Sequence, residues 1–276
     1  MKILICTDGS PAAEQAAHLV SLLSFPSETE IMLLGVVEEH GSPAGLEASF
    51  ARMTAVLGGA HANLAQKVRR GDSYEQILAE AVEHAYDLVV VGGAGQHHGL
   101  LHFKVGSTTG KLARKLHTHF LVARNVPEKV GKVLVCTGAE SPTVKTMRVG
   151  GQILSGLQVA VTVLHVMSQV SLKPGNIPEE LAVTAEVAIQ RNTREGQQLQ
   201  RAVEQLSKTG IQGTIAPCLR HGLVVDEVLA EVREGKYDLM VVGAHYQPGQ
   251  NRWLGMLLDD VTDQLLNQAA CSVLIV

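Results

Sequence analysis

The chain has 276 residues, which is enough for one large domain or two ordinary ones with a sizeable core. Hydrophobic residues make up 46% and charged residues 18%, a balance typical of soluble globular proteins. The formal net charge is -4 without any block of basic residues, and no apolar run approaches the roughly 18 residues of a transmembrane helix. We therefore expect no nucleic-acid partner, no membrane role and a cytoplasmic location.

The first half of the chain alternates short apolar runs with segments of helical spacing. We predict strands at residues 2–7, 30–37, 64–68, 87–92 and 119–123, and helices at residues 11–23, 44–57, 73–84 and 107–116. In the third of these helices, Ser73 is the predicted N-cap. The apolar stripe of that helix consists of Ile77, Leu78, Ala81 and Val82.

The pattern then repeats, which decides the domain organisation. The segment at Lys2, KILICTDGSPA, returns at Lys132 as KVLVCTGAESP. The segment at Gly71, GDSYEQILAEAVEHAYDLVVVGGA, returns at Gly222 as GLVVDEVLAEVREGKYDLMVVGAH. The offset grows from 130 to 151 residues, so the second copy carries 21 more residues, which we expect to form a loop and a longer helix. We predict two similar domains, at residues 1–126 and 131–276.

Each copy has the order of elements that builds an α/β fold. We predict in each domain a doubly wound, five-stranded parallel sheet of order 3-2-1-4-5 with helices on both faces. Ligands of such sheets bind beyond the carboxyl ends of the strands, where the order reverses between strands 1 and 4. Asp8 ends the first strand and a glycine-rich stretch follows the fourth, so we expect the two to face each other.

That stretch, GGAGQHHGLLHFKVGSTTGK, runs from Gly92 to Lys111. Its glycines allow positive φ and close backbone approach, and Gly106 opens a helix whose free N–H groups suit phosphate. An ordinary strand-to-helix loop is the alternative. The segment GSTTGK is not a Walker motif, since three residues instead of four separate its glycines, and Leu112 follows the lysine.

Together the start of the chain, the strand DLVVVG and the glycine pattern resemble the universal stress proteins, in tandem form. In the family's nucleotide signature nine residues lie between the second and third glycines, whereas here ten residues, 96–105, do so. The resemblance implies that the first domain binds ATP or another adenine nucleotide, and it leaves open a divalent cation such as Mg²⁺. It assigns the adenosine to Thr7, Asp8 and Val36, and the phosphates to Gly92, Gly93, Gly95, Gly106, Ser107 and Thr108.

The second domain departs from this pattern at the same positions. Asp259 and Asp260 stand where the first domain has Gly106 and Ser107, Gly138 replaces Asp8, and Tyr246 replaces the second glycine. A carboxylate about 4 Å from a phosphate costs on the order of 4 kcal/mol at an effective dielectric of about 20. We therefore predict that the second site binds no triphosphate and that one chain binds one nucleotide.

The last strand of each copy is short, apolar and open to pairing. Universal stress proteins usually dimerise through that strand, so the resemblance implies an intramolecular pseudo-dimer in which FLVA pairs with SVLIV, and it leaves a further homodimer open. The four cysteines show no CxxC spacing and are predicted to be reduced thiols.

The glycine-rich stretch also holds His97, His98 and His102. They lack the HxH or HExxH spacing of a metal site, and no nucleophile elbow surrounds Ser10, so we predict neither a metal site nor catalytic residues. The leading hypothesis is a nucleotide-binding stress or signalling protein without dedicated catalysis. A weak metal-dependent ATPase and a dimerising scaffold that binds no nucleotide are the two alternatives.

Overall fold

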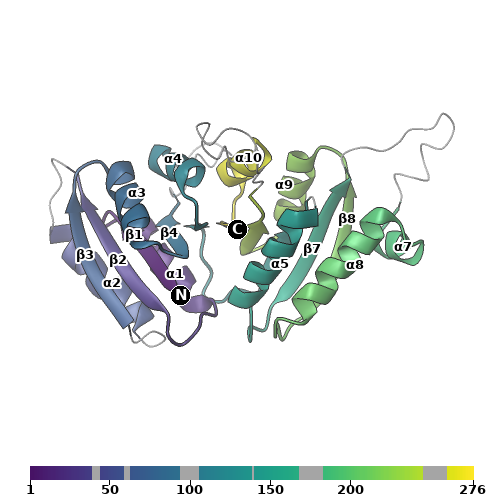
Figure 1. Cartoon of the computed structure of the whole chain (residues 1–276), viewed down its shortest axis with the longest axis horizontal. Helices are drawn as coiled ribbons and strands as arrows, with labels where there is room; N and C mark the ends of the chain where they lie inside the picture. The colour runs from purple at the N-terminus through teal and green to yellow at the C-terminus, as the bar shows by residue number, and fades with distance from the viewer. Residues whose placement is uncertain (39–43, 59–62, 94–105, 139, 168–182, 245–259) are drawn as a thin grey trace.

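The computed structural model describes residues 1–38, 44–58, 63–93, 106–138, 140–167, 183–244 and 260–276. In these residues ten strands form one continuous sheet (Figure 1). The first half contributes β1 (Lys2–Thr7), β2 (Glu30–Val37), β3 (Asn63–Arg70), β4 (Leu88–Gly92) and β5 (His119–Ala123). The second half contributes β6 (Lys132–Cys136), β7 (Ala160–Met167), β8 (Ile215–His221), β9 (Leu239–Val242) and β10 (Ser272–Ile275).

The strand order confirms the predicted topology in both halves. It runs β3-β2-β1-β4-β5 and then β10-β9-β6-β7-β8, and every pair within a half is parallel. The halves join where β5 pairs with β10 in antiparallel register, Leu121 opposite Leu274. The expected pairing of these two strands is present, and it places the two sheets side by side as one.

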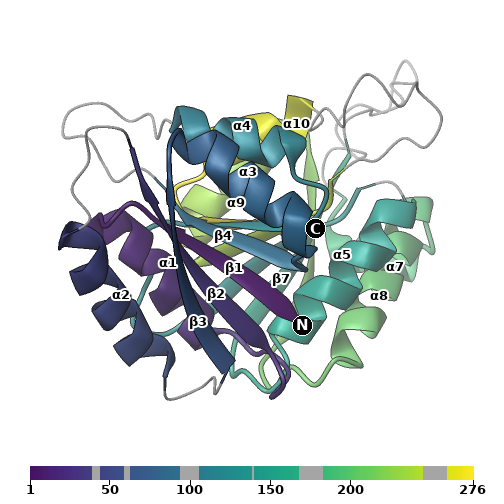
Figure 2. The same cartoon turned by 60° about the vertical axis from the view of Figure 1, so that its left-hand side comes forward.

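Helices cover both faces of the sheet because neighbouring strand residues point to opposite sides. The bounds are α1 (Pro11–Leu22), α2 (Ala44–Leu57), α3 (Ser73–His84), α4 (Ser107–Lys115), α5 (Glu140–Ile153), α7 (Ala185–Gln190), α8 (Arg194–Ser207), α9 (Val224–Gly235) and α10 (Asp260–Gln268). Ile3 and Ile5 point into a core shared by α1, α2, α5, α7 and α8. Leu4 and Cys6 point into the opposite core, with α3, α4, α9 and α10 (Figure 2).

Helix α3 differs from its sequence prediction in two respects. Its N-cap is Asp72, whose carboxylate accepts from the N–H of Glu75 at 3.0 Å, because Ser73 already lies inside the helix. Its buried face contains Ile77 and Glu80, whereas Val82 is 73% exposed. Three of the four predicted stripe residues therefore face the core, since Leu78 and Ala81 pack against it beside buried Ile77. Only Val82 was predicted wrongly, and the buried Glu80 was missed.

The additional residues of the second half form a separate short helix, not the longer one expected. Helix α8 is 14 residues long, the same length as α2 in the first half, and α7 is an additional helix that precedes it. The two pack closely, since a Cβ on Gly196 would lie 2.2 Å from the carbonyl oxygen of Ala188. Residues 168–182, where the loop was expected, lie outside the described residues.

The cysteines are free thiols, as predicted. Cys6 and Cys271 are buried, and burial raises the pKa of both thiols above the usual range. Burial likewise raises the pKa of Cys218 to about 11.

Among the helices that the structure describes, none is both long and apolar enough to cross a bilayer.

Candidate functional site

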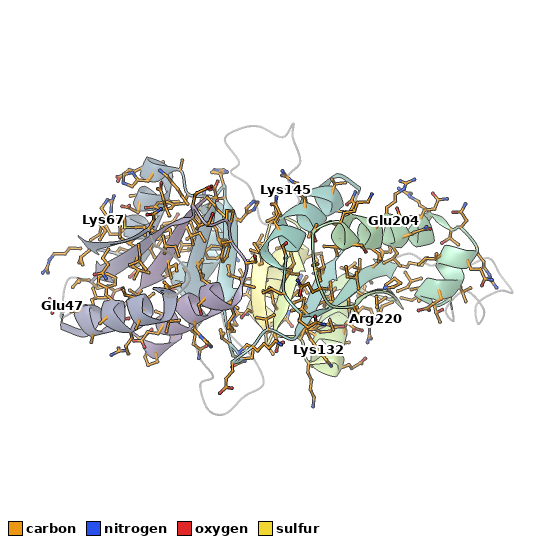
Figure 3. All side chains as sticks on the ribbon, turned by 90° about the horizontal axis from the view of Figure 1, so that it is seen from below. Glu47, Lys67, Lys132, Lys145, Glu204 and Arg220 are labelled. Carbon is orange, nitrogen blue, oxygen red and sulfur yellow. The ribbon has the colours of Figure 1, made fainter. Side chains whose placement is uncertain are left out.

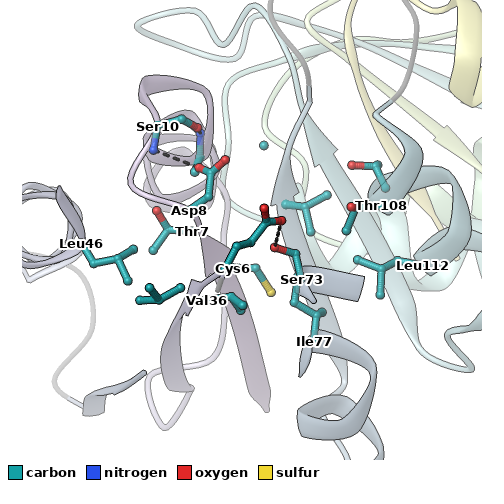
Figure 4. Close-up of a pocket in the computed structure, with 16 residues that line it drawn as sticks. Cys6, Thr7, Asp8, Ser10, Val36, Leu46, Ser73, Ile77, Thr108 and Leu112 are labelled. Atoms are coloured by element: carbon teal, nitrogen blue, oxygen red, sulfur yellow. Dashed lines mark hydrogen bonds between the residues drawn. The ribbon is translucent and has the colours of Figure 1, made fainter. Parts of the chain in front are cut away.

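A cavity of about 430 Å³ lies beyond the carboxyl ends of β1 and β4, where the strand order reverses. It is lined by five residues predicted from the sequence, Thr7, Asp8, Val36, Gly92 and Thr108. Other residues that line it include Ser10, Val37, Glu38, Leu46, Ser73, Ile77 and Leu112. Asp8 lies on one side of the cavity and Thr108 on the other (Figure 4).

The end of β1 presents one carboxylate to this cavity. The Oδ1 atom of Asp8 accepts from the N–H of Ser10 at 2.9 Å, which fixes the side chain at the start of α1. Its Oδ2 atom has no hydrogen bond to another described residue. Thr7 is buried, and its hydroxyl bonds Ser49 at 3.2 Å and the N–H of Gly9 at 3.0 Å. Asp8 therefore offers a ligand its side chain, whereas the hydroxyl of Thr7 is occupied.

The end of β2 supplies an apolar wall with a second carboxylate above it. Val36 is buried at the floor, and Ile77 and Leu112 face it from α3 and α4. Glu38 follows the strand and accepts a hydrogen bond of 3.2 Å from the hydroxyl of Ser73 (Figure 4). The cavity thus combines a surface suited to a flat apolar group with acceptors at its rim.

Glycines at the end of β4 are required by packing. A Cβ on Gly92 would lie 2.2 Å from the carbonyl oxygen of Ala12, and one on Gly93 would lie 2.5 Å from Cγ of Arg124. Neither glycine has positive φ. The N–H of Gly93 donates to Ala123 at 2.8 Å. Close approach of α1 to the sheet therefore explains Gly92, and Gly95 lies outside the described residues.

The start of α4 faces the cavity with unbonded N–H groups. Gly106 is the N-cap without a side-chain hydrogen bond, and a Cβ there would meet no atom of the described residues within 4 Å. The first helical hydrogen bond runs from Gly110 to Gly106, so the N–H groups of Ser107 and Thr108 lack a partner in the described part of the chain. This end of the helix carries a partial positive charge and suits an anion.

The cavity has no arginine or lysine among its described lining residues. Its full charges are the carboxylates of Asp8 and Glu38, and its positive end is α4. A charged ligand is therefore expected to place its anionic group at α4 and its hydrogen-bond donors at the carboxylates.

One group of potential metal ligands lies elsewhere, at Glu80, Glu83 and His84. Glu80 already accepts from Lys67 and Arg69, each at 2.7 Å. That cluster is an ion-pair network of the fold. The predicted loop histidines His97, His98 and His102 lie outside the described residues.

The same region of the second half is built differently. Helix α10 begins at Asp260 where α4 begins at Ser107. The carbonyl of Gly138 accepts from Thr143 at 3.2 Å and from the side chain of Gln198 on α8. Side chains from α5 and α8 therefore hold the end of β6, and glycine stands at the position of Asp8. Asp259 and Tyr246 lie outside the described residues.

Comparison with protein families identifies the family to which this architecture belongs. The sequence profile of the universal stress protein family matches residues 1–124 and again residues 129–276. The chain belongs to the universal stress protein family. Comparison with curated protein sequences found no match.

Solved structures of universal stress proteins share the whole tandem arrangement. One from Archaeoglobus fulgidus DSM 4304 has a TM-score of 0.64 and 14% sequence identity, covering 99% of this chain and 97% of that one. A putative universal stress protein from Pseudomonas aeruginosa UCBPP-PA14 has a TM-score of 0.65 and 14% identity, covering 100% of this chain and 92% of that one. At this identity the likeness establishes the fold.

Sequence reasoning missed part of the site in this universal stress protein. Glu38 was not among the predicted site residues, and Ser73 was predicted only as a helix cap, yet the two bond each other at the cavity. The available signal was their position, since both follow the carboxyl ends of strands. Conversely, Ser107 and Gly106 lie at the start of α4 but do not line the cavity as Thr108 does.

Proposed function

We propose that this universal stress protein binds one adenine nucleotide per chain, in the cavity of its first half, and acts as a nucleotide-dependent stress or signalling module without dedicated catalytic machinery. The observation that carries the proposal is the opposition of Asp8 and the start of α4, whose first N–H groups have no described partner, across a cavity of about 430 Å³ with Val36 at its floor. The adenosine would lie on Val36 with its donors toward Asp8, and the phosphates would lie at Ser107 and Thr108.

The proposal that only the first half binds nucleotide rests on two differences in the second half, at the start of α10 and at the end of β6. A phosphate at the start of α10 would meet the exposed carboxylate of Asp260. Repulsion of about 4 kcal/mol at about 4 Å exceeds the roughly 0.3–1 kcal/mol that a helix end provides. The bonds to Gly138 further occupy the position where the first half has Asp8.

Mg²⁺ would be held by the phosphate oxygens of the nucleotide at the start of α4, since oxygen atoms are its preferred ligands. When bound, the ion would supply positive charge to the phosphates. The pairing of β5 with β10 supports the proposal that the two domains form an intramolecular pseudo-dimer.

Mass spectrometry of nucleotide released from the purified protein, followed by calorimetric titration with ATP, tests the proposal. We expect one site per chain and at least a tenfold weaker affinity for Ser107→Asp, which copies Asp260. Ser27→Asp, on an exposed turn away from the cavity, is the matched control and should bind as the wild type does. Two sites per chain would contradict the restriction to the first half. Absence of any nucleotide binding would favour the scaffold alternative, and steady phosphate release would favour the ATPase.

A further inference from the structure

A second cavity, of about 770 Å³, lies between the two halves. It is at the amino ends of the first-half strands, whereas the first cavity is at their carboxyl ends. The first half contributes residues at the amino ends of its strands, Met1, Asp87 and His119, and the turn after α1. The second half contributes the end of α5 and Lys208, which follows α8. Figures 1 and 2 both place the start of β1 beside α5. This cavity is therefore distinct from the nucleotide cavity, which lies at the carboxyl ends of the strands.

Its rim carries positive charge that the protein does not neutralise. Arg148 and Lys208 line the cavity, and neither side chain has an ion pair or a hydrogen bond with another described residue. Lys145, on α5 at the junction of the halves, lines an adjoining cavity that shares Asp87 and His119 (Figure 3). Burial, and then the charge of Arg148, lower the pKa of Lys145. None of the three cations therefore forms an ion pair with another described residue.

Among the described lining residues of the two cavities, Asp87 is the one carboxylate, and its single negative charge does not balance three cations. Its Oδ2 atom accepts from the main-chain N–H of Lys2 at 2.7 Å. Three helices, α1, α5 and α8, also end near this edge, and each end carries a partial negative charge of about half a unit. Their last carbonyls are partly satisfied locally, as where the N–H of Ser24 donates to Ile153 across the halves at 2.9 Å. The full charges of Arg148, Lys145 and Lys208 outweigh these partial charges.

A buried polar atom with no partner faces the same region. The Nδ1 atom of His119 is buried and has no hydrogen bond to any described residue. Burial, and then the charge of Lys145, lower the pKa of His119 to about 4, so the ring is uncharged at neutral pH. An uncharged imidazole can donate from one nitrogen, and a buried unpaired one gains a hydrogen bond when a ligand supplies the partner.

The rest of the lining combines apolar and polar side chains in similar measure. Phe25 and Pro26 lie on one side, and Val149 and Ile153 lie on the other. Such a lining accepts a hydrocarbon or aromatic body, while the cations at the rim accept a negative group.

We propose that the cavity between the halves binds a small organic anion, with its apolar body between Phe25 and Val149 and its negative group at Arg148 and Lys208. The ligand would contact both halves at once, so its binding would stabilise their junction. The site requires no nucleotide in the first cavity, and it stands independently of the proposed function.

Fluorescence titration with anilinonaphthalene sulfonate, an aromatic body with one anionic group, tests this proposal on the full chain. The double variant Arg148→Gln/Lys208→Gln should weaken binding at least tenfold, because it removes two attractive charges. The control Lys129→Gln/Arg201→Gln removes two exposed charges outside the cavity and should bind within about twofold of the wild type. Phenylnaphthylamine, the same body without the sulfonate, should bind at least tenfold more weakly and show no difference between the variants.

Nuclear magnetic resonance of the imidazole supplies a second readout. The bound sulfonate should raise the pKa of His119 in the wild type and leave it unchanged in the double variant. If the double variant binds the sulfonate as tightly as the control, or if the neutral probe binds equally well, or if the pKa of His119 does not move, the proposal is wrong.

Discussion

The hydroxyl of Tyr86 donates a hydrogen bond of 3.1 Å to Glu80, a carboxylate that is completely buried beneath β3. The second half repeats the arrangement with Tyr237 and Glu231, at 2.7 Å. In each half an arginine of the edge strand completes the network at 2.7 Å, Arg69 in the first half and Arg220, which Figure 3 labels, in the second. A duplicated network of this kind locks helices α3 and α9 against the edges of the sheet.

Replacement of Glu80 should destabilise the protein strongly. Burial raises the pKa of Glu80, but hydrogen bonds from Lys67 and Arg69 outweigh burial and lower it below the usual value. Glu80→Ala removes the acceptor of the Tyr86 hydroxyl and one ion-pair partner each of Lys67 and Arg69, so we expect a loss of about 2–4 kcal/mol in the free energy of unfolding, measured in urea. Glu83→Ala breaks an exposed pair with Arg69 and should lose less than about 1 kcal/mol. If both variants lost the same free energy of unfolding, Glu80 would contribute no more than an exposed ion pair does.

Alanine at Gly92 should damage both stability and nucleotide binding. The added Cβ would lie 2.2 Å from the carbonyl oxygen of Ala12 and push α1 off the sheet, so we expect a loss of about 2–3 kcal/mol in urea unfolding and weaker ATP binding. Gly106→Ala meets open space and changes only the cap, for a loss of at most about 1 kcal/mol. If the Gly92→Ala protein were as stable as the Gly106→Ala protein, the close contact between Gly92 and the backbone of Ala12 would be contradicted.

Neutralising Asp8 should weaken nucleotide binding without disturbing the fold. Asp8→Asn keeps an oxygen for the N–H of Ser10 and removes the charge, so we expect about tenfold weaker ATP binding and a change below about 0.5 kcal/mol in stability. Asp72→Asn makes the same change at the cap of α3, outside the cavity, and should leave affinity unchanged. Calorimetric titration of both variants with ATP measures the difference. Equal ATP affinities of the two variants would show that Asp8 does not contribute to nucleotide binding.

The protein should lose stability between about pH 6.5 and pH 4. In the unfolded chain His119 binds a proton below pH 6.5, whereas burial and the charges of Lys145 and Arg148 lower its pKa in the folded protein to about 4, against the smaller opposing effect of Asp87. Acid therefore favours the unfolded state in this window. The shift corresponds to about 3 kcal/mol, and screening of the half-buried ring reduces it to about 1–2 kcal/mol.

The variant His119→Asn isolates that contribution. Its loss of stability between pH 7 and pH 4.5, measured by urea unfolding, should be smaller than the wild type's by about 1–2 kcal/mol. His165, whose pKa burial also lowers, contributes equally to both proteins and cancels in the comparison. The same loss in both would show that His119 titrates normally.

Local pattern was sufficient to predict most elements and the topology. Apolar runs without polar alternation identified β1, β2 and β4, and the repeat predicted one strand order for both halves. The pattern at β3 was weaker, because this edge strand has exposed residues on both faces, and the strand is longer than predicted, Asn63–Arg70. The stripe of helix α3 was predicted with one wrong residue, Val82, and without Glu80, because periodicity does not indicate that a carboxylate is buried with partners on another strand.

The sequence by itself determined that the chain is two copies of one α/β unit, because strand and helix periods are local and repeat at a measurable offset. It also determined that Asp8 and the start of α4 face the same cavity, because right-handed crossovers bring the carboxyl ends of β1 and β4 together. Only the tertiary structure decided that Gly92 is required by the backbone of α1, that Glu38 reaches the cavity, and that His119 and Arg148 border a common cavity. These relationships join residues from separate elements, and the distances between them depend on how side chains of both halves pack, which no local pattern encodes.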